Sequence, residues 1–370
     1  MQFIDLNKQY LRYKERIDGA IASSLSSSSF ILGKEVNTLE SRLAEYVGCK
    51  YCLTVANGTD ALHIAELAIG IDQKCNVILP SYTWVSTAET VEMLGAEIRF
   101  ADINKDTFNI DSEHVKQLID SQTKLIIGVS IFGQTCELEE LQKIADDEEI
   151  MFLEDGAQSF GAMSGAIKSC SYADISTTSF FPSKPLGCYG DGGAIFTNNI
   201  DIYNQCKLLA RHGQDDEKVF QIAGFNSRLD EIQAAVLNIK LDYFDQEIQL
   251  RQDVASQYKD KFSEHAAEIK IPYINKNMVS AYAQYTIQFS NDALPEFVKK
   301  YLHEAGIPSV TYYTPPVHMH PAYSKHASSL HVTEKLSKRT LSLPFHPFMT
   351  SEEIEKVSSA VIQAVEVFAE

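Results

Sequence analysis

One lysine of the chain stands in an unusual loop. Lys184 lies in residues 179–193, SFFPSKPLGCYGDGG, a segment rich in serine, proline and glycine that separates two apolar runs. A lysine held on irregular backbone at a sheet edge can lose solvation, have a lowered pKa and attack an aldehyde or ketone as an amine. The alternative is a surface lysine in a glycine-rich turn, and this segment alone favours neither interpretation.

A carboxylate and a possible anion site follow two other apolar runs. Asp155 comes at the end of the run at 151–154, where open α/β sheets place their ligands. Residues 57–60, Asn-Gly-Thr-Asp, are typical of a turn from a strand into a helix. There Gly58 lets the backbone approach a ligand, and the helix N–H groups attract an anion. The P-loop motif is absent and no G-x-G-x-x-G follows a predicted strand, so nucleoside triphosphate and dinucleotide binding lack their main signatures.

The only tryptophan, Trp84, follows a predicted strand end and could belong to the core or present a flat aromatic face. Together these features meet the needs of pyridoxal 5'-phosphate. Helix N–H groups take the phosphate, an aromatic ring stacks, Asp155 keeps the pyridine nitrogen protonated, and Lys184 forms the Schiff base. Their joint occurrence therefore predicts a site for this cofactor.

The elements that must position these residues follow from the apolar pattern. Short apolar runs alternate with amphipathic stretches over the first two-thirds of the chain, which is typical of an α/β fold with a mostly parallel sheet. We expect a single sheet of about seven strands. The strand candidates are 51–55, 77–79, 96–100, 124–130, 151–154, 175–178 and 193–197.

The pattern changes near Leu229. Apolar residues at helical spacing up to Tyr258 predict long helices that lead into a second domain. That domain has a strand candidate, a proline-rich loop and a final helix, at 285–289, at 314–321 and after Thr350 respectively. We expect a large cofactor-binding domain at 1–249 and a small C-terminal domain at 250–370.

Composition narrows the class of protein. The 370 residues include 50 acidic and 32 basic side chains, a formal net charge of −18, which opposes binding to nucleic acid or to an anionic membrane. The start of the chain has neither a basic segment nor an apolar stretch, and no apolar run approaches the roughly 20 residues that cross a bilayer. We expect a cytoplasmic protein that binds neither nucleic acid nor membrane.

The seven cysteines all lie within the first 206 residues, and their odd number fits reduced thiols better than a disulfide framework. Cys49 and Cys52 form a C-x-x-C motif. A zinc site would need a second pair or a matching histidine cluster, so we interpret them as small residues at the start of a strand and expect no metal.

The ordered set of motifs resembles the DegT-type nucleotide-sugar aminotransferases, over nearly the whole chain. The matching segments are 3–6, 31–36, 56–60, 154–158, 183–184, 210–213, 226–230 and 343–347. The resemblance implies the three-layer α/β/α aspartate-aminotransferase fold, fold type I, with a smaller C-terminal α+β domain. It also implies pyridoxal 5'-phosphate as the cofactor, and a homodimer with shared active sites.

Carried over residue by residue, the resemblance implies Lys184 as the Schiff-base lysine and Asp155 as the partner of the ring nitrogen. The other cofactor contacts it implies are Gln158 near the ring hydroxyl, Trp84 on the ring, Gly58, Thr59 and Ser179 at the phosphate, and Asn226 reaching the phosphate from the neighbouring subunit.

Within that family, the segments around Lys184 and Arg228 look most like those of enzymes that aminate UDP-2-acetamido-2-deoxy-3-keto-glucuronic acid. Arg228 is then a candidate for the sugar carboxylate, because a guanidinium can bind one through two hydrogen bonds. We also expect Tyr313 and His318 to contact the substrate. Where those enzymes lead us to expect a histidine, this chain has Tyr312, which leaves open a neutral 3-keto or 4-keto deoxy sugar.

Several alternatives accompany this interpretation. His318 and His320 could form a metal pair, although we favour a loop that lines the sugar pocket. A regulatory protein could keep the cofactor without turnover, and related sugar dehydratases carry histidine in place of the lysine, whereas position 184 is lysine here. A dehydrogenase lacks its glycine motif. We expect an aminotransferase of bacterial surface-glycan (lipopolysaccharide or O-antigen) biosynthesis, with L-glutamate as the amino donor.

Overall fold

A seven-stranded sheet forms the centre of the larger part of the molecule in the computed structural model, which describes residues 1–326 and 328–370. The strand order is β1-β9-β8-β5-β4-β2-β3, and only β9 runs antiparallel to its neighbours. The mostly parallel sheet predicted from the sequence is confirmed. Its strands are β1 (Tyr51–Val55), β2 (Asn76–Pro80), β3 (Glu97–Ala101), β4 (Thr123–Val129), β5 (Met151–Asp155), β8 (Ile175–Ser179) and β9 (Gly193–Thr197).

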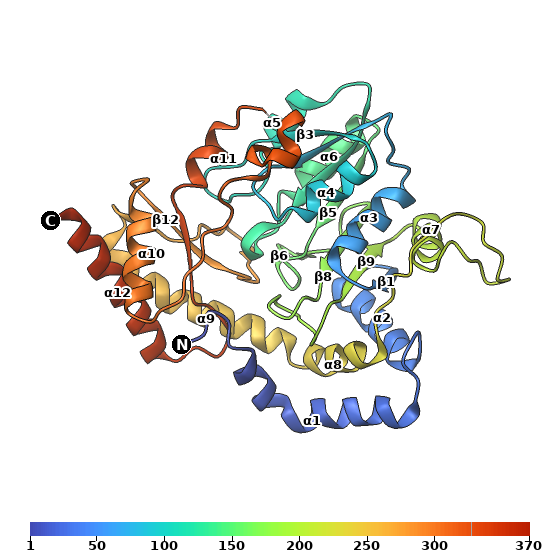
Figure 1. Ribbon diagram of the computed structural model, residues 1–370, viewed down its shortest axis with the longest axis horizontal. Coiled ribbons are helices and arrows are strands. Elements are labelled where there is room, and N and C mark those ends of the chain that lie inside the picture. Colours follow the sequence, from blue (N-terminus) through green and yellow to red (C-terminus); the bar gives the residue numbers. More distant parts are fainter. Residues whose placement is uncertain (327) are drawn as a thin grey trace.

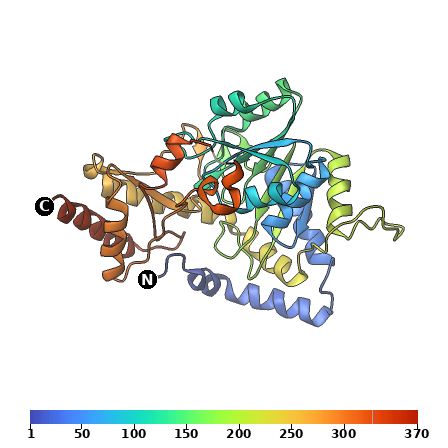
Figure 2. The same ribbon diagram turned by 45° about the horizontal axis from the view of Figure 1, so that its top comes forward.

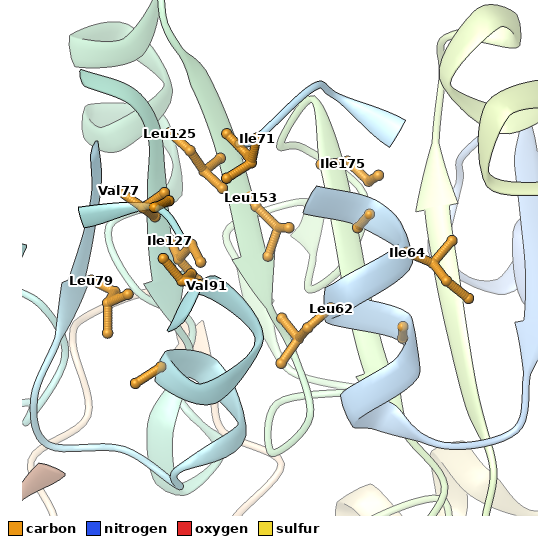
Figure 3. Close-up of a cluster of buried hydrophobic side chains, with 14 of the residues drawn as sticks. Leu62, Ile64, Ile71, Val77, Leu79, Val91, Leu125, Ile127, Leu153 and Ile175 are labelled. Atoms are coloured by element: carbon orange, nitrogen blue, oxygen red, sulfur yellow. The ribbon is translucent and has the colours of Figure 1, made fainter. Parts of the chain in front are cut away.

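Helices cover both faces of this sheet, so its strands read as continuous apolar runs. One face packs against α3 (Gly58–Ala68), α4 (Ser86–Met93) and α7 (Ile200–Ala210). In Figure 3, Leu62 of α3 and Val91 of α4 lie over Ile127 and Leu153 of the sheet. The opposite face packs against α2 (Lys34–Val47), α5 (Ser112–Leu118), α6 (Leu138–Asp147) and α8 (Glu231–Leu241). The three-layer α/β/α arrangement expected for fold type I is therefore present.

The smaller part lies at the end of the molecule near the C-terminus (Figure 1). The predicted strand at 285–289 and the predicted last helix are both confirmed. A sheet of order β10-β12-β13 packs against three helices, and its core draws only on residues from Val254 to Val365. The elements are α9 (Phe244–Phe262), β10 (Ile269–Lys270), β12 (Tyr285–Phe289), α10 (Leu294–Glu304), β13 (Thr340–Leu343) and α12 (Ser351–Ala369).

The predicted division at 249/250 falls inside α9 and stays a prediction. The segment after the second tyrosine of Tyr312-Tyr313, although late in the chain, packs on the large sheet: Val317, Tyr323 and Leu330 belong to its core. That segment contains η3 (Val317–Met319), η4 (Pro321–His326) and α11 (His331–Leu336).

The N-terminal helix α1 (Leu6–Ser27) was not predicted. Only Tyr13, Ile17 and Ser24 of it are buried, so its apolar stripe is too narrow to stand out in the sequence. It lies along α8 at the lower edge of Figure 1. Residues 23–27 of a serine-rich stretch form the last part of this helix.

The remaining elements are short. They are η1 (Ile131–Gly133), β6 (Met163–Ser164), β7 (Ile167–Lys168), η2 (Ser263–His265) and β11 (Met278–Val279), of which β11, β6 and β7 form a small sheet. Within residues 1–326 and 328–370, no helix combines the length and the apolar character needed to span a membrane.

Candidate active site

A small cradle forms where β1 turns into α3. Asn57 caps the helix with its side chain, and the backbone N–H groups of Gly58 and Thr59 donate to no acceptor within the described chain. A Cβ at Gly58 would lie 2.8 Å from Cβ of Ser179, so glycine lets the end of β8 meet the helix N-terminus. Thr59 Oγ1 lies 2.8 Å from Ser86 Oγ of α4. Free N–H groups and hydroxyls at one helix N-terminus make an anion site.

A carboxylate lies at the end of β5, and a lysine lies in the loop that follows β8. Asp155 ends β5 and is buried; its Oδ2 accepts a hydrogen bond from Thr87 Oγ1 at 2.9 Å, and its Oδ1 accepts one from the Ala157 N–H at 3.1 Å. Burial raises the pKa of Asp155, while these hydrogen bonds and the charge of Lys184 oppose the rise. Burial also disfavours the charged form of Lys184 and so lowers its pKa, and the charge of Asp155 opposes that shift. The two side chains therefore interact electrostatically within one site.

The loop that carries Lys184 is hydrogen-bonded to α8. Buried Lys240 donates from Nζ to the carbonyl oxygen of Gly187 at 2.6 Å. The loop is tightly folded, because a Cβ at Gly187 would lie 2.4 Å from the carbonyl oxygen of Pro182. The half-buried Lys184 thus stands on fixed backbone, unlike a lysine in a free surface turn.

Aromatic rings form one wall of the site. Trp84 is 59% exposed, and its ring centroid lies 6.5 Å from that of Tyr313. Gln158 is buried; its Nε2 donates to the Tyr313 hydroxyl at 2.7 Å, and its Oε1 accepts from the Phe132 N–H at 2.9 Å. Trp84 is therefore free to stack on a ligand, and Gln158 is fixed in orientation.

His318 does not line an open pocket. It is buried, with Nδ1 2.6 Å from Ser81 Oγ and Nε2 3.5 Å from the carboxylate of Glu334. The exposed His320 instead places Nε2 3.1 Å from a backbone carbonyl oxygen of its own loop. The pair therefore does not converge on a metal, and His318 fastens its loop to the end of β2. The expected contact between His318 and substrate stays a prediction.

Asn226 and Arg228 lie between α7 and α8. The chain between these helices extends away from the body of the molecule in both views (Figures 1 and 2). Asn226 is exposed and Arg228 is half-buried, and between them Ser227 accepts a hydrogen bond through Oγ from the Ala56 N–H at 3.1 Å. The segment is thus fixed beside the cradle. Neither Asn226 nor the guanidinium of Arg228 has a side-chain partner among residues 1–326 and 328–370.

The cysteine motif carries no metal site in this fold. Cys49 is half-buried and Cys52 is buried, and both are free thiols. In the part of the chain that the structure describes, no three His, Cys, Asp or Glu side chains are arranged to hold a metal ion.

Sequence reasoning missed the hydroxyl groups of α4. Ser86 contacts Thr59, Thr87 supports Asp155, and Thr90 bonds Glu66 of α3. Three hydroxyl side chains within five residues of one predicted helix were the available signal. Serine and threonine disfavour helix interiors unless they have hydrogen-bonding work there.

A protein-family model matches residues 12–362, and its description reads DegT/DnrJ/EryC1/StrS aminotransferase family. A similar characterised protein is the UDP-2-acetamido-2-deoxy-3-oxo-D-glucuronate aminotransferase of Pseudomonas aeruginosa. It is 43% identical over 98% of this chain and 99% of its own.

Two solved structures extend the comparison. A DegT DnrJ EryC1 StrS aminotransferase from Brucella abortus is 36% identical, with a TM-score of 0.94 over 98% of this chain and 99% of its own. NtdA from Bacillus subtilis, solved with bound cofactor PMP, is 26% identical, with a TM-score of 0.92 over 99% of this chain and 85% of its own.

Proposed function

Because the chain belongs to the DegT/DnrJ/EryC1/StrS aminotransferase family, we propose that it aminates UDP-2-acetamido-2-deoxy-3-keto-glucuronic acid. The chain is a pyridoxal-phosphate-dependent nucleotide-sugar aminotransferase, and the reaction class and cofactor expected from its sequence are confirmed. The particular sugar, the donor and the contacts of individual residues are the proposal.

The residues present fit the cofactor. The cradle at Gly58 leaves no room for a Cβ and offers two backbone N–H groups without partners, which suits a phosphate group. Asp155 is a buried carboxyl whose two hydrogen bonds favour its charged form, and a pyridinium N–H would match that charge. Trp84 supplies an exposed aromatic face on the same side of the sheet end.

The cofactor supplies a carbonyl for covalent bonding to an amine and a ring that accepts electrons from the bond being broken. Lys184 can bond the carbonyl as a neutral amine, a form that burial favours, and once released it can carry a proton between the substrate carbon and the cofactor. Asp155 would hold the proton on the ring nitrogen through charge pairing. Gln158, fixed by Phe132 and Tyr313, would orient the ring hydroxyl.

The uronate as substrate rests on one observation: Arg228 presents a guanidinium without a protein partner in the described chain, next to the strand end that leads into the phosphate cradle. Such a cation can bind a carboxylate through two parallel hydrogen bonds. The name of the Pseudomonas relative, a 3-oxo-glucuronate aminotransferase, supports the same choice.

A neutral 3-keto or 4-keto deoxy sugar is the second candidate. Tyr312 stands where a histidine was expected, and its carbonyl oxygen is held by Thr340 Oγ1 at 3.0 Å. A tyrosine offers no positive charge for a carboxylate, so this position favours a neutral sugar.

The working unit would be a homodimer with shared sites. Asn226 would reach the partner's cofactor phosphate. The second subunit would also cover large apolar side chains that are exposed on the lysine loop and on the chain between α7 and α8: Phe181 is 51%, Val219 49% and Phe220 65% exposed. L-Glutamate would be the donor, and the product would enter bacterial surface-glycan synthesis in the cytoplasm, where the seven free thiols stay reduced.

Mass spectrometry of reaction products tests the proposal. The holoenzyme with L-glutamate should convert the 3-keto uronate into a product carrying an amine in place of the ketone. Neutral 3-keto and 4-keto nucleotide sugars serve as matched substrates. Faster amination of a neutral sugar would replace the uronate by the second candidate, and no amine on any of them would contradict the activity itself.

A further inference from the structure

A glutamate that the reaction does not use lies in the apolar core beneath the cofactor site. Glu66 is on α3, one turn after Leu62, and its side chain contacts Thr90 of α4. Figure 3 shows Leu62 and Val91, which pack between these two helices and the sheet. Glu66 has no exposed surface. Its Oε1 lies 2.8 Å from Thr90 Oγ1, and its Oε2 is buried with no hydrogen-bond partner among the residues that the structure describes.

The hydrogen-bond pattern favours one protonation state of Glu66. The Thr90 hydroxyl carries one proton and has two possible acceptors, Glu66 Oε1 at 2.8 Å and the carbonyl oxygen of Ser86 at 3.1 Å. An ionised Glu66 would be a buried charge with one hydrogen bond and a bare oxygen, which is strongly unfavourable. A neutral Glu66 that donates to Thr90 lets Thr90 donate to Ser86, so each proton has an acceptor.

Helix α4, which Glu66 contacts through Thr90, also carries two hydroxyl side chains of the cofactor site. Thr87 of α4 donates to Asp155 at 2.9 Å, and Ser86 Oγ lies 2.8 Å from Thr59 in the phosphate cradle. We propose that Glu66 is a positioning residue. As a neutral acid it donates a hydrogen bond to Thr90 and so fixes the position of α4. Thr87 and Ser86 of α4 would then support the cofactor at its ring nitrogen and at its phosphate.

The surroundings of Glu66 are consistent with this state. The charged group that faces it is Asp155 of β5, and the sheet strands and helices packed around α3 add no cation near it within the described chain. Burial raises the pKa of Glu66 well above its usual value, the hydrogen bond with Thr90 opposes that rise, and the charge of Asp155 adds to it.

Infrared difference spectroscopy tests the neutral acid without relying on activity. The spectrum of the wild-type protein minus that of Glu66→Gln, recorded near neutral pH with and without cofactor, should contain the carbonyl stretch of an un-ionised carboxyl group. A difference confined to carboxylate bands would overturn the proposal. Glu66→Gln, whose amide can also donate to Thr90, should keep turnover within about twofold of wild type.

A double-mutant cycle tests whether Glu66 acts through Thr90. Glu66→Leu and Thr90→Val should each weaken cofactor binding by roughly tenfold, and the double variant should be little worse than either, since both remove one connection. Thr286→Val removes a buried hydroxyl that bonds Ser342 in the small domain, and it is the matched control. It should lower the melting temperature without changing cofactor affinity.

Independent effects of Glu66→Leu and Thr90→Val, or an unchanged cofactor affinity in both, would overturn the positioning role. The inference rests on the proposed placement of the ring nitrogen at Asp155. A failure of the inference about Glu66 can nevertheless be distinguished from a failure of the proposed function. The infrared measurement and a thermal unfolding cycle on the apoprotein report on Glu66 and Thr90 even if the cofactor binds another way.

Discussion

The candidate site has an inner half, formed by Gly58, Asp155, Gln158 and Ser179, and an outer half, formed by Asn226 and Arg228. The two halves differ in how many of their polar side chains find a partner within one chain. At the inner half, Asp155 and Gln158 are buried and bonded, and Gly58 meets Ser179 directly. At the outer half, Asn226 and Arg228 have fixed backbone but no side-chain partners in the described chain. The side chains of the inner half are therefore fixed by contacts within one chain, whereas the polar groups of the outer half are free to bind a ligand or a second subunit under the proposed function.

Removing the reactive amine should have the largest effect. Lys184→Ala should lower turnover by at least about 10³-fold, because no other amine of the described chain stands beside Asp155, while cofactor should still bind through the cradle. Borohydride reduction of the wild-type holoenzyme, followed by mass mapping, should find the cofactor on Lys184. Label on another lysine would contradict the assignment, and the exposed Lys124→Ala should behave as wild type.

Loss of charge at the ring nitrogen should rank second. Asp155→Asn keeps the shape of the side chain but cannot hold the pyridinium proton by charge, so turnover should fall by about 10²-fold or more with little loss of bound cofactor. Steady-state kinetics and the cofactor absorbance separate the two quantities. Near-normal turnover would remove Asp155 from this role; the exposed Asp146→Asn is the control.

The role of Arg228 in the outer half can be tested by comparing kcat/KM for two substrates, with and without a carboxylate. Arg228→Ala should lower kcat/KM for the uronate by about 10- to 10³-fold more than for the matching neutral 6-deoxy sugar, because the carboxylate loses its two hydrogen bonds. Arg228→Lys should fall between the two. An equal loss for both sugars would show that Arg228 serves the diphosphate or the loop instead.

Subunit mixing asks whether Asn226 belongs to the neighbouring site. Lys184→Ala and Asn226→Ala chains are each inactive or weak alone. In an equal mixture, about half of the dimers would be mixed and each would hold one intact site, so roughly a quarter of wild-type activity should return. No recovery in verified mixed dimers would indicate that one chain builds the whole site.

The smallest expected effect concerns stability and pH. Burial holds the pKa of Glu66 well above its usual value, so the folded chain keeps a proton that the unfolded chain releases as pH rises. This stabilisation is complete below the usual glutamate pKa and is lost as pH rises toward the raised one. Between about pH 5 and about pH 8, the melting temperature of the apoprotein should therefore fall less in Glu66→Gln than in wild type, by roughly 1–3 °C. The exposed Glu139→Gln should follow the wild-type curve.

The local sequence predicted helices and strands well where one or both faces of the element are apolar. The predicted strand at 193–197 is β9, but its antiparallel direction follows from the short connection that returns from β8 through the lysine loop, which periodicity does not encode. Helix α1 escaped notice because most of it faces solvent. His318 was expected at a pocket because a histidine in a proline-rich loop has several uses, and only packing against Ser81 selects one.

The sequence by itself determined the α/β class, the seven-stranded sheet, and the lysine, carboxylate and helix N-terminus that a pyridoxal phosphate enzyme needs, because each depends on residue types within a few positions of one another. Only the tertiary structure decided that Gly58 meets Ser179, that α4 joins Thr59, Glu66 and Asp155, and that His318 turns inward. These contacts join segments distant along the chain. Their geometry is set by how helices pack on the twisted sheet, which no local pattern specifies.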